Sequence, residues 1–178
     1  MSLREMRLTG SGGQGLILAG IIFAEAALLD GNNAIQTQSY GPEARGGASK
    51  AEVLISTEAI DFPKVEQPDI LLALTQIASD KYVTDIREKG ILIVDETVEI
   101  PSNLKVSKIV RAPILRTAAE VLGKSIVANI VAIGLITELT KVVSRENLEK
   151  AVLARVPKGT EDLNRRALEE GYKLAELA

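Results

Sequence analysis

Short apolar runs alternate with helix-like segments along this chain, and the alternation predicts its elements. Residues 51–55, 70–74 and 90–95 are mostly aliphatic, which is typical of strands in a sheet covered on both faces. Residues 33–38 alternate weakly between apolar and polar side chains, and residues 106–110 form one more short run. We expect all five segments to be strands.

Longer segments between these runs have helical spacing. Residues 14–29 carry one charge, Glu25, and are followed by Gly31, a residue common just past a helix end. Residues 75–88 are expected to form a second helix. Its predicted inward positions are Ile77, Tyr82, Val83 and Ile86.

Residues 125–139 form the most apolar predicted helix, and we expect it to be buried against the sheet and against a partner surface. Asn129 is the one polar residue deep in this run, and a satisfied core amide is the default interpretation. Ser144 and Thr160 each stand before acidic residues, so both are predicted to cap the two helices that close the chain.

The order of elements predicts an α/β fold with three layers, α/β/α. Because strands and helices alternate, the central sheet is expected to be largely parallel, with a mixed sheet as the alternative. A chain of 178 residues can form one full core but is short for two. We therefore predict a single domain over residues 1–178.

The stretch between a first apolar strand and the first helix reads GSGGQG, a Rossmann-like glycine turn. Glycine permits positive φ and close approach, and a helix start directs N–H groups and a positive dipole end at an anion. The candidate ligand-binding residues here are Gly10, Ser11, Gly12, Gly13, Gln14 and Gly15. A purely structural role, in which the glycines only permit a tight connection, stays open.

Two familiar nucleotide-binding motifs fit this turn poorly. A dinucleotide site would need an acidic residue about 20 residues on, to bind the ribose, whereas residues 35–39 contain no carboxylate. A Walker phosphate loop would need Lys and Ser or Thr after the last glycine, where the chain has Leu16 and Ile17.

A second unusual stretch, residues 39–49, reads SYGPEARGGAS. It combines an aromatic ring, a planar cation suited to phosphate or carboxylate and glycines that let a partner approach the backbone. An ordinary irregular loop remains the alternative. The candidate ligand-binding residues of this stretch are Tyr40, Gly41, Arg45, Gly46 and Gly47.

Charged residues also follow two of the predicted strands. Asp95 and Glu96 stand at the carboxyl end of one strand, the edge where open α/β sheets place their sites, although a solvated strand end is the more frequent outcome. Arg111 follows another strand and could meet an anion, although a surface arginine is commoner.

Composition narrows the chemistry. The sequence has no Cys and no His, which excludes thiolate nucleophiles, cysteine-bound iron–sulfur clusters and Ser-His-Asp catalysis on this chain. No catalytic residue and no metal ligand can be named. A net charge of −3 argues against nucleic-acid partners. With no signal peptide and no membrane-length apolar run, we expect a cytoplasmic protein.

The two glycine stretches, GSGGQG at residues 10–15 and SYGPEARGG at residues 39–47, resemble in order and spacing those of the gamma subunit of the 2-oxoacid:ferredoxin oxidoreductases. The resemblance covers nearly the full length. It implies membership of an enzyme complex that oxidatively decarboxylates a 2-oxoacid, usually to an acyl-CoA, and passes electrons to ferredoxin. The chain is expected to be inactive alone.

The resemblance also implies where the cofactors lie. Thiamine diphosphate and iron–sulfur clusters are expected on partner alpha and beta subunits and on a delta subunit where one is present, with none bound by this chain alone. Both glycine stretches would face neighbouring subunits near the active site and help to receive CoA. No residue inherits a proton-transfer role.

Two other functions stay open. A stand-alone nucleotide- or phosphate-binding protein would bind an anion at residues 10–15 by itself, and a homodimeric scaffold would pair through residues 125–139. The substrate is not fixed by the motifs, since pyruvate, 2-oxoglutarate, branched-chain oxoacids and indolepyruvate are all used in the family. A short, separate subunit favours 2-oxoglutarate or a general 2-oxoacid.

Overall fold

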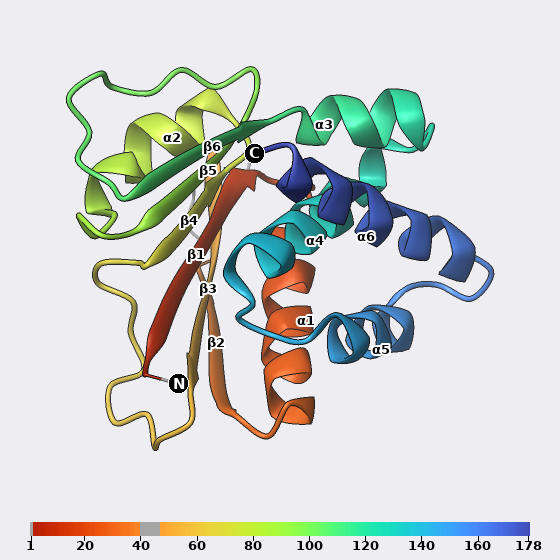
Figure 1. The fold of residues 1–178 in the computed structure, drawn as a ribbon, viewed down its shortest axis with the longest axis horizontal. Coiled ribbons are helices and arrows are strands. Elements are labelled where there is room, and N and C mark those ends of the chain that lie inside the picture. Colours follow the sequence, from red (N-terminus) through yellow and green to blue (C-terminus); the bar gives the residue numbers. More distant parts are fainter. Residues whose placement is uncertain (1, 40–46) are drawn as a thin grey trace.

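The computed structural model describes residues 2–39 and 47–178, which form a sheet between two layers of helix (Figure 1). The strands of this described part are β1 (Arg4–Ser11), β2 (Asn33–Ser39), β3 (Ala48–Ser56), β4 (Ile70–Ala73), β5 (Ile91–Asp95) and β6 (Lys108–Ala112). The α-helices are α1 (Leu16–Leu29), α2 (Gln76–Tyr82), α3 (Ile114–Arg116), α4 (Ala128–Thr140), α5 (Arg145–Arg155) and α6 (Glu161–Glu176).

The sheet is mixed, with the strand order β2-β3-β1-β4-β5-β6. β1, β4, β5 and β6 pair in parallel, whereas β3 is antiparallel to both of its neighbours, β1 and β2. Residues 40–47, between β2 and β3, are too few for the crossover that a parallel pair requires. The prediction of an α/β fold with a largely parallel or mixed sheet is confirmed.

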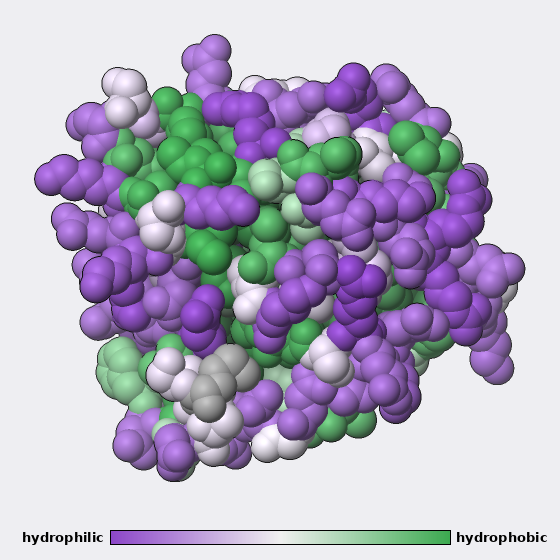
Figure 2. Space-filling model, viewed as in Figure 1, coloured by the Kyte–Doolittle hydropathy of each residue, from purple (hydrophilic) through white to green (hydrophobic). Residues whose placement is uncertain are grey.

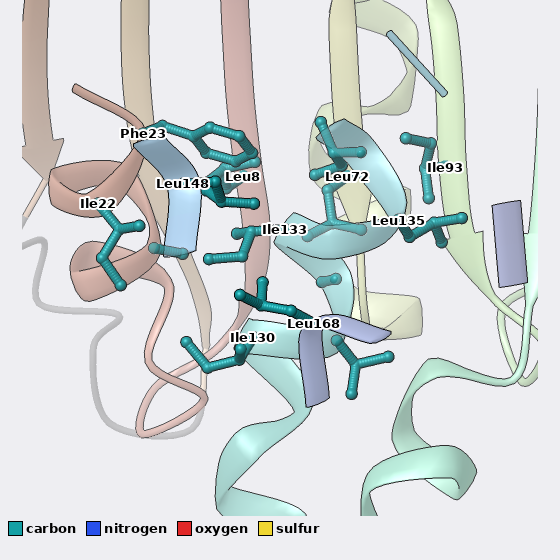
Figure 3. Close-up of a cluster of buried hydrophobic side chains, with 14 of the residues drawn as sticks. Leu8, Ile22, Phe23, Leu72, Ile93, Ile130, Ile133, Leu135, Leu148 and Leu168 are labelled. Atoms are coloured by element: carbon teal, nitrogen blue, oxygen red, sulfur yellow. The ribbon is translucent and has the colours of Figure 1, made fainter. Parts of the chain in front are cut away.

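The two faces of the sheet are covered unequally. α1, α4, α5 and α6 lie on one face, and α2 lies on the other (Figure 1). Figure 3 shows the larger core, where Leu8, Leu72 and Ile93 of the sheet lie near Phe23 of α1 and Ile133 of α4. Apolar burial on this face supplies most of the driving force for folding.

The smaller face contains buried charge. Arg7, which alternates with the apolar residues of β1, donates to Glu52 at 2.7 Å and to Asp85 at 2.6 Å. Its guanidinium also lies 5.6 Å from the ring centroid of Tyr82 in α2. Because Arg7 is paired and hydrogen-bonded, its burial does not leave an isolated charge.

α2 is shorter than predicted. After Tyr82 the chain turns into a 3-10 helix, Val83–Asp85, and Ile86 is extended. The prediction that Ile77 faces inward is wrong, because Ile77 is 58% exposed while Ala78 and Tyr82 are buried. The other three predicted inward residues, Tyr82, Val83 and Ile86, are buried as expected.

α4 is covered by its own chain, so the prediction that it packs on a partner surface is wrong. Every residue from 128 to 137 is buried within this chain, and α6 lies along the helix (Figure 1). The close approach depends on paired glycines, since a Cβ on Gly171 would lie 2.3 Å from the carbonyl oxygen of Val131, and one on Gly134 would lie 2.7 Å from that of Leu168.

The predicted start of this helix also differs. Residues 125–127 form a 3-10 turn ahead of α4, and Ile126 is 77% exposed. Of the two predicted caps, Ser144 is confirmed, because its Oγ accepts from the N–H of Asn147. Thr160 is not a side-chain cap: its hydroxyl donates to the carbonyl of Pro157 and accepts from Asn164.

The molecular face in Figure 2 is mostly polar, with apolar side chains gathered over the β6 edge of the sheet. Ile109 of that edge strand is 43% exposed. Within the described ranges, every helix is too short or too polar to cross a bilayer.

Candidate functional site

The glycine turn lies between the end of β1 and the start of α1, at the carboxyl edge of the parallel strands. Gly13 and Gly15 take left-handed backbone conformations, with φ of 86° and 74°, which side chains rarely adopt. The side chain of Gln14 folds back so that its Oε1 accepts from the N–H of Ser11 at 2.7 Å. This oxygen therefore forms a hydrogen bond within the turn.

Gly10 is required by the same arrangement. A Cβ at this position would lie 2.3 Å from Oε1 of Gln14 and 3.3 Å from Cβ of Leu74. The first glycine of the motif therefore makes room for the side chain that closes the turn.

The last glycine of the turn is held by Asn129, from the start of α4. Its Nδ2 donates to the carbonyl oxygen of Gly15 at 3.1 Å, and a Cβ on Gly15 would lie 2.4 Å from that nitrogen. Sequence reasoning expected Asn129 to be a satisfied core amide and missed its contact with the turn. The only available signal was its place as one amide in an apolar helix.

The start of α1 remains open to a ligand. Its N-cap is Gly15, and its first turn contains no acidic residue. Among the described residues no side chain caps this end, and Ala19 is the first residue whose N–H reaches the carbonyl of Gly15, at 3.0 Å. The free N–H groups and the helix dipole favour an anion here.

Two pockets flank the turn, and Gly13 and Ile126 line both of them. One has a volume of about 560 Å³ and includes Gln14, Arg116 and Ser125. Arg116 pairs with Glu96, the Nε–Oε1 distance being 2.8 Å, and this exposed pair leaves the guanidinium close to the pocket.

The other pocket has a volume of about 460 Å³ and is mainly apolar, with a few polar groups. Leu18, Ile130 and others form the apolar wall, and the polar side chains come from Asn129, Arg155, Thr160 and Asn164. A ligand spanning both pockets would need an anionic part at the turn and a less polar part beyond it.

The predicted site residues of the first glycine stretch thus lie together, from residue 10 to residue 15. Of the second stretch, Tyr40, Gly41, Arg45 and Gly46 lie outside the described residues. Gly47 is half-buried and directly precedes β3.

The register of β3 shows where the second stretch re-enters the sheet. Ala48, the first residue of β3, pairs with Ser11 of the glycine turn, and Ser49 pairs with Gly10. The described end of the second glycine stretch therefore lies beside the first. This pairing joins the two motifs that the sequence separates by more than 20 residues.

The charged residues at the carboxyl ends of β5 and β6 form hydrogen bonds within this chain. Asp95 is fully buried and accepts from the N–H of Leu115 at 2.9 Å and from the hydroxyl of Thr97 at 2.8 Å. Arg111 donates to the carbonyl oxygens of Glu96 and Val98. The interpretation of Asp95 as a solvated strand end is therefore wrong. Glu96 and Arg111 are exposed, which confirms a solvated strand end for Glu96 and a surface arginine for Arg111.

Neither a dinucleotide nor a metal fits the described site. The antiparallel β3 lies between β1 and β2, so the strand that would carry the ribose-binding acid is not adjacent to the turn. Within residues 2–39 and 47–178, no three His, Cys, Asp or Glu side chains are grouped as metal ligands would be.

Known proteins share both the sequence and this architecture. The family "Pyruvate ferredoxin/flavodoxin oxidoreductase" matches residues 5–174. The 2-oxoglutarate synthase subunit KorC of Methanocaldococcus jannaschii is 54% identical over 177 residues, covering 97% of this chain and 94% of that protein. The chain therefore belongs to the pyruvate ferredoxin/flavodoxin oxidoreductase family.

Solved structures place the chain more narrowly within this family. The gamma subunit of keto/oxoacid ferredoxin oxidoreductase from Geobacter sulfurreducens is 50% identical and has a TM-score of 0.88, covering 98% of this chain and 99% of that one. The chain is a gamma subunit of a 2-oxoacid:ferredoxin oxidoreductase, as the resemblance predicted.

A longer protein contains the same fold. The chain superposes with a TM-score of 0.87 and 20% identity on 2-oxoglutarate:ferredoxin oxidoreductase from Magnetococcus marinus, a structure with 2-oxoglutarate, coenzyme A and succinyl-CoA bound. The match covers all of this chain but 32% of that one. At this identity the likeness establishes the fold.

Proposed function

We propose that residues 1–178 act as one gamma-type domain in a complex that oxidatively decarboxylates 2-oxoglutarate. The observation that carries this proposal is the 54% identity with a 2-oxoglutarate synthase subunit over 97% of this chain. In the proposed reaction the bond between the carboxylate and the keto carbon breaks and carbon dioxide leaves. The acyl group joins the sulfur of CoA, whose thiol proton is released, and the two electrons pass to ferredoxin.

The redox cofactors would belong to other subunits. This sequence has no Cys to bind an iron–sulfur cluster, and the acidic residues beside the turn are occupied, Asp95 by backbone N–H groups and Glu96 by Arg116. The residues present do not fit thiamine diphosphate or a cluster. Partner alpha and beta subunits, and a delta subunit where one is present, are proposed to supply them.

The glycine turn is proposed to receive the phosphate groups of CoA. Support comes from the uncapped start of α1, from the two pockets that meet at Gly13 and Ile126, and from Arg116 beside one of them. The second glycine stretch, Tyr40 to Gly47, is proposed to add Arg45 as a further cation. CoA is bound in the Magnetococcus enzyme, which has the same fold.

Substrate preference tests the first part of this proposal. The purified complex is assayed for dye reduction with 2-oxoglutarate, pyruvate and a branched-chain oxoacid, each with and without CoA. We expect kcat/KM for 2-oxoglutarate to exceed the values for pyruvate and the branched-chain oxoacid by about tenfold or more. Recognition of the second carboxylate of 2-oxoglutarate can supply such a ratio. A higher value for another oxoacid would reassign the substrate.

A matched pair of arginine variants tests the CoA role. Arg45→Ala is expected to raise the KM for CoA in the assembled enzyme and to leave this chain folded, because Arg45 is the one cation of its glycine stretch. Arg166→Ala, at an exposed position on α6, is the control and should have no effect. Unchanged kinetics in both variants would remove Arg45 from the site.

A further inference from the structure

Asn129 connects the glycine turn to the most deeply buried helix of the chain. The residue is 4% exposed, and both polar atoms of its side chain are hydrogen-bonded. Nδ2 donates to the carbonyl oxygen of Gly15 at 3.1 Å, and Oδ1 accepts from the N–H of Ile130 at 2.9 Å. Gly15 and Asn129 lie 114 residues apart in the sequence.

The contact adds a second hydrogen bond to a peptide that takes part in one helical bond. Gly15 is left-handed, with φ of 74°, and glycine has access to several other backbone conformations. Its carbonyl oxygen accepts from Asn129 on one side and from the N–H of Ala19 on the other, at 3.0 Å. These two bonds set the direction of the first N–H groups of α1.

The helix that carries Asn129 is itself rigidly placed. Residues 128–137 are all buried, and the glycine contacts between α4 and α6 leave little room for sliding. On the other side of the turn, Gln14 is bonded to Ser11. The turn is therefore held by two amides, one local and one on a helix from the other half of the chain.

We propose that Asn129 is a positioning residue, which holds the glycine turn in the orientation that receives an anionic group of CoA. This inference rests on the proposed binding of CoA phosphates at the turn. Asn129 does not react. Its amide acts through Gly15, and well-supported backbone donors of this kind bind a ligand more tightly because less order is lost on binding.

Two variants separate the donor from the shape of the side chain. Asn129→Asp keeps an oxygen for the N–H of Ile130 but replaces the donor that faces Gly15, and Asn129→Leu removes both polar atoms at similar volume. The control is Ile133→Val, a core change on the same helix (Figure 3). Each variant is assembled into the complete complex.

Hydrogen exchange and kinetics are then measured on the same samples. We expect peptides covering residues 10–20 to exchange about tenfold faster in both Asn129 variants, since the hydrogen bond to Gly15 is lost, while residues 131–140 match the control. The KM for CoA should rise about tenfold with little change in kcat or in the KM for the oxoacid.

The outcomes discriminate between the two proposals. Unchanged exchange at residues 10–20, or an equal rise there and in α4, would overturn the positioning role. Faster exchange confined to the turn with an unchanged KM for CoA would support the positioning role and overturn the binding of CoA at the turn.

Discussion

The N-termini of α3 and α1 lie at the same edge of the sheet, but their free N–H groups are treated in opposite ways. At the start of α3, which follows β6, the N–H of Leu115 donates to the buried Asp95 at the end of β5, so a carboxylate of the protein satisfies that helix start. After β1, uncharged amides shape the turn and the start of α1 is left without a side-chain cap. The carboxylate satisfies one end internally, and the amides leave the other available to an external anion.

The largest expected effect comes from Gly15→Ala. The alanine would be strained at φ of 74° and would overlap Nδ2 of Asn129, 2.4 Å from its Cβ, so we expect a loss of about 2–4 kcal/mol in unfolding free energy.

Gly13→Ala is the matched control for that change. Gly13 is also left-handed, but nothing lies within 4 Å of a Cβ there, so the loss should be about 1–2 kcal/mol. Denaturant unfolding of the full chain measures both. Equal losses would show that Asn129 does not constrain Gly15.

Asp95→Ala should destabilise the other helix start by about 2 kcal/mol, because the N–H of Leu115 and the hydroxyl of Thr97 lose a buried acceptor. Denaturant unfolding gives the loss, and hydrogen exchange should locate it at residues 114–118. A variant as stable as the original would mean that the carboxylate is not needed to finish this end.

Arg116→Ala tests whether this nearby cation helps to bind CoA at the uncapped start of α1. Arg116 lines a pocket beside the turn and is 56% exposed in its ion pair with Glu96, so stability should change by less than about 0.5 kcal/mol. The KM for CoA should rise about threefold to tenfold through loss of a charge-assisted contact. No rise would separate Arg116 from the ligand.

The smallest expected change in stability comes from Asp30, whose carboxylate accepts hydrogen bonds at the start of α5. Burial raises the pKa of Asp30, but bonds from the hydroxyl and N–H of Ser144 and from the amide of Asn147 outweigh it, so the pKa lies below its usual range. The stabilisation is therefore present above the unfolded pKa of about 3.9 and is lost as pH falls through the lower folded value.

Asp30→Asn should remove this acid dependence. Denaturant unfolding between about pH 2 and pH 5 should show a smaller loss of stability in the variant than in the original chain, by less than about 1 kcal/mol after solvent screening. Asp162→Asn is the control, since the Asp162 side chain is 97% exposed. Identical pH profiles for the original chain and Asp30→Asn would contradict the capping role.

Local patterns predicted much of the fold. The strands, the glycine turn and the Ser144 cap follow from periodicity and short motifs. The insertion of β3 between β1 and β2 did not follow, because pairing order depends on contacts distant in sequence. The coverage of α4 was missed for the same reason, since it requires Gly134 and Gly171 to meet across two helices.

The candidate site was predictable to a similar degree. The GSGGQG motif located the turn. The hydrogen bond from Asn129 to Gly15 joins residues 114 apart in the sequence, so no local pattern predicts it. The exposed Ile126 between the pockets was also missed, because an apolar run does not show where a 3-10 turn displaces one residue outward.

The most direct test of the central claim is a pull-down of the tagged chain from a lysate of its own cells, followed by a dye-reduction assay that requires both CoA and a 2-oxoacid. We predict recovery of larger partner subunits with iron–sulfur absorbance and activity, highest with 2-oxoglutarate. Recovery of the chain alone, inactive with every oxoacid and binding an anion by itself, would contradict its role as a subunit of the oxidoreductase.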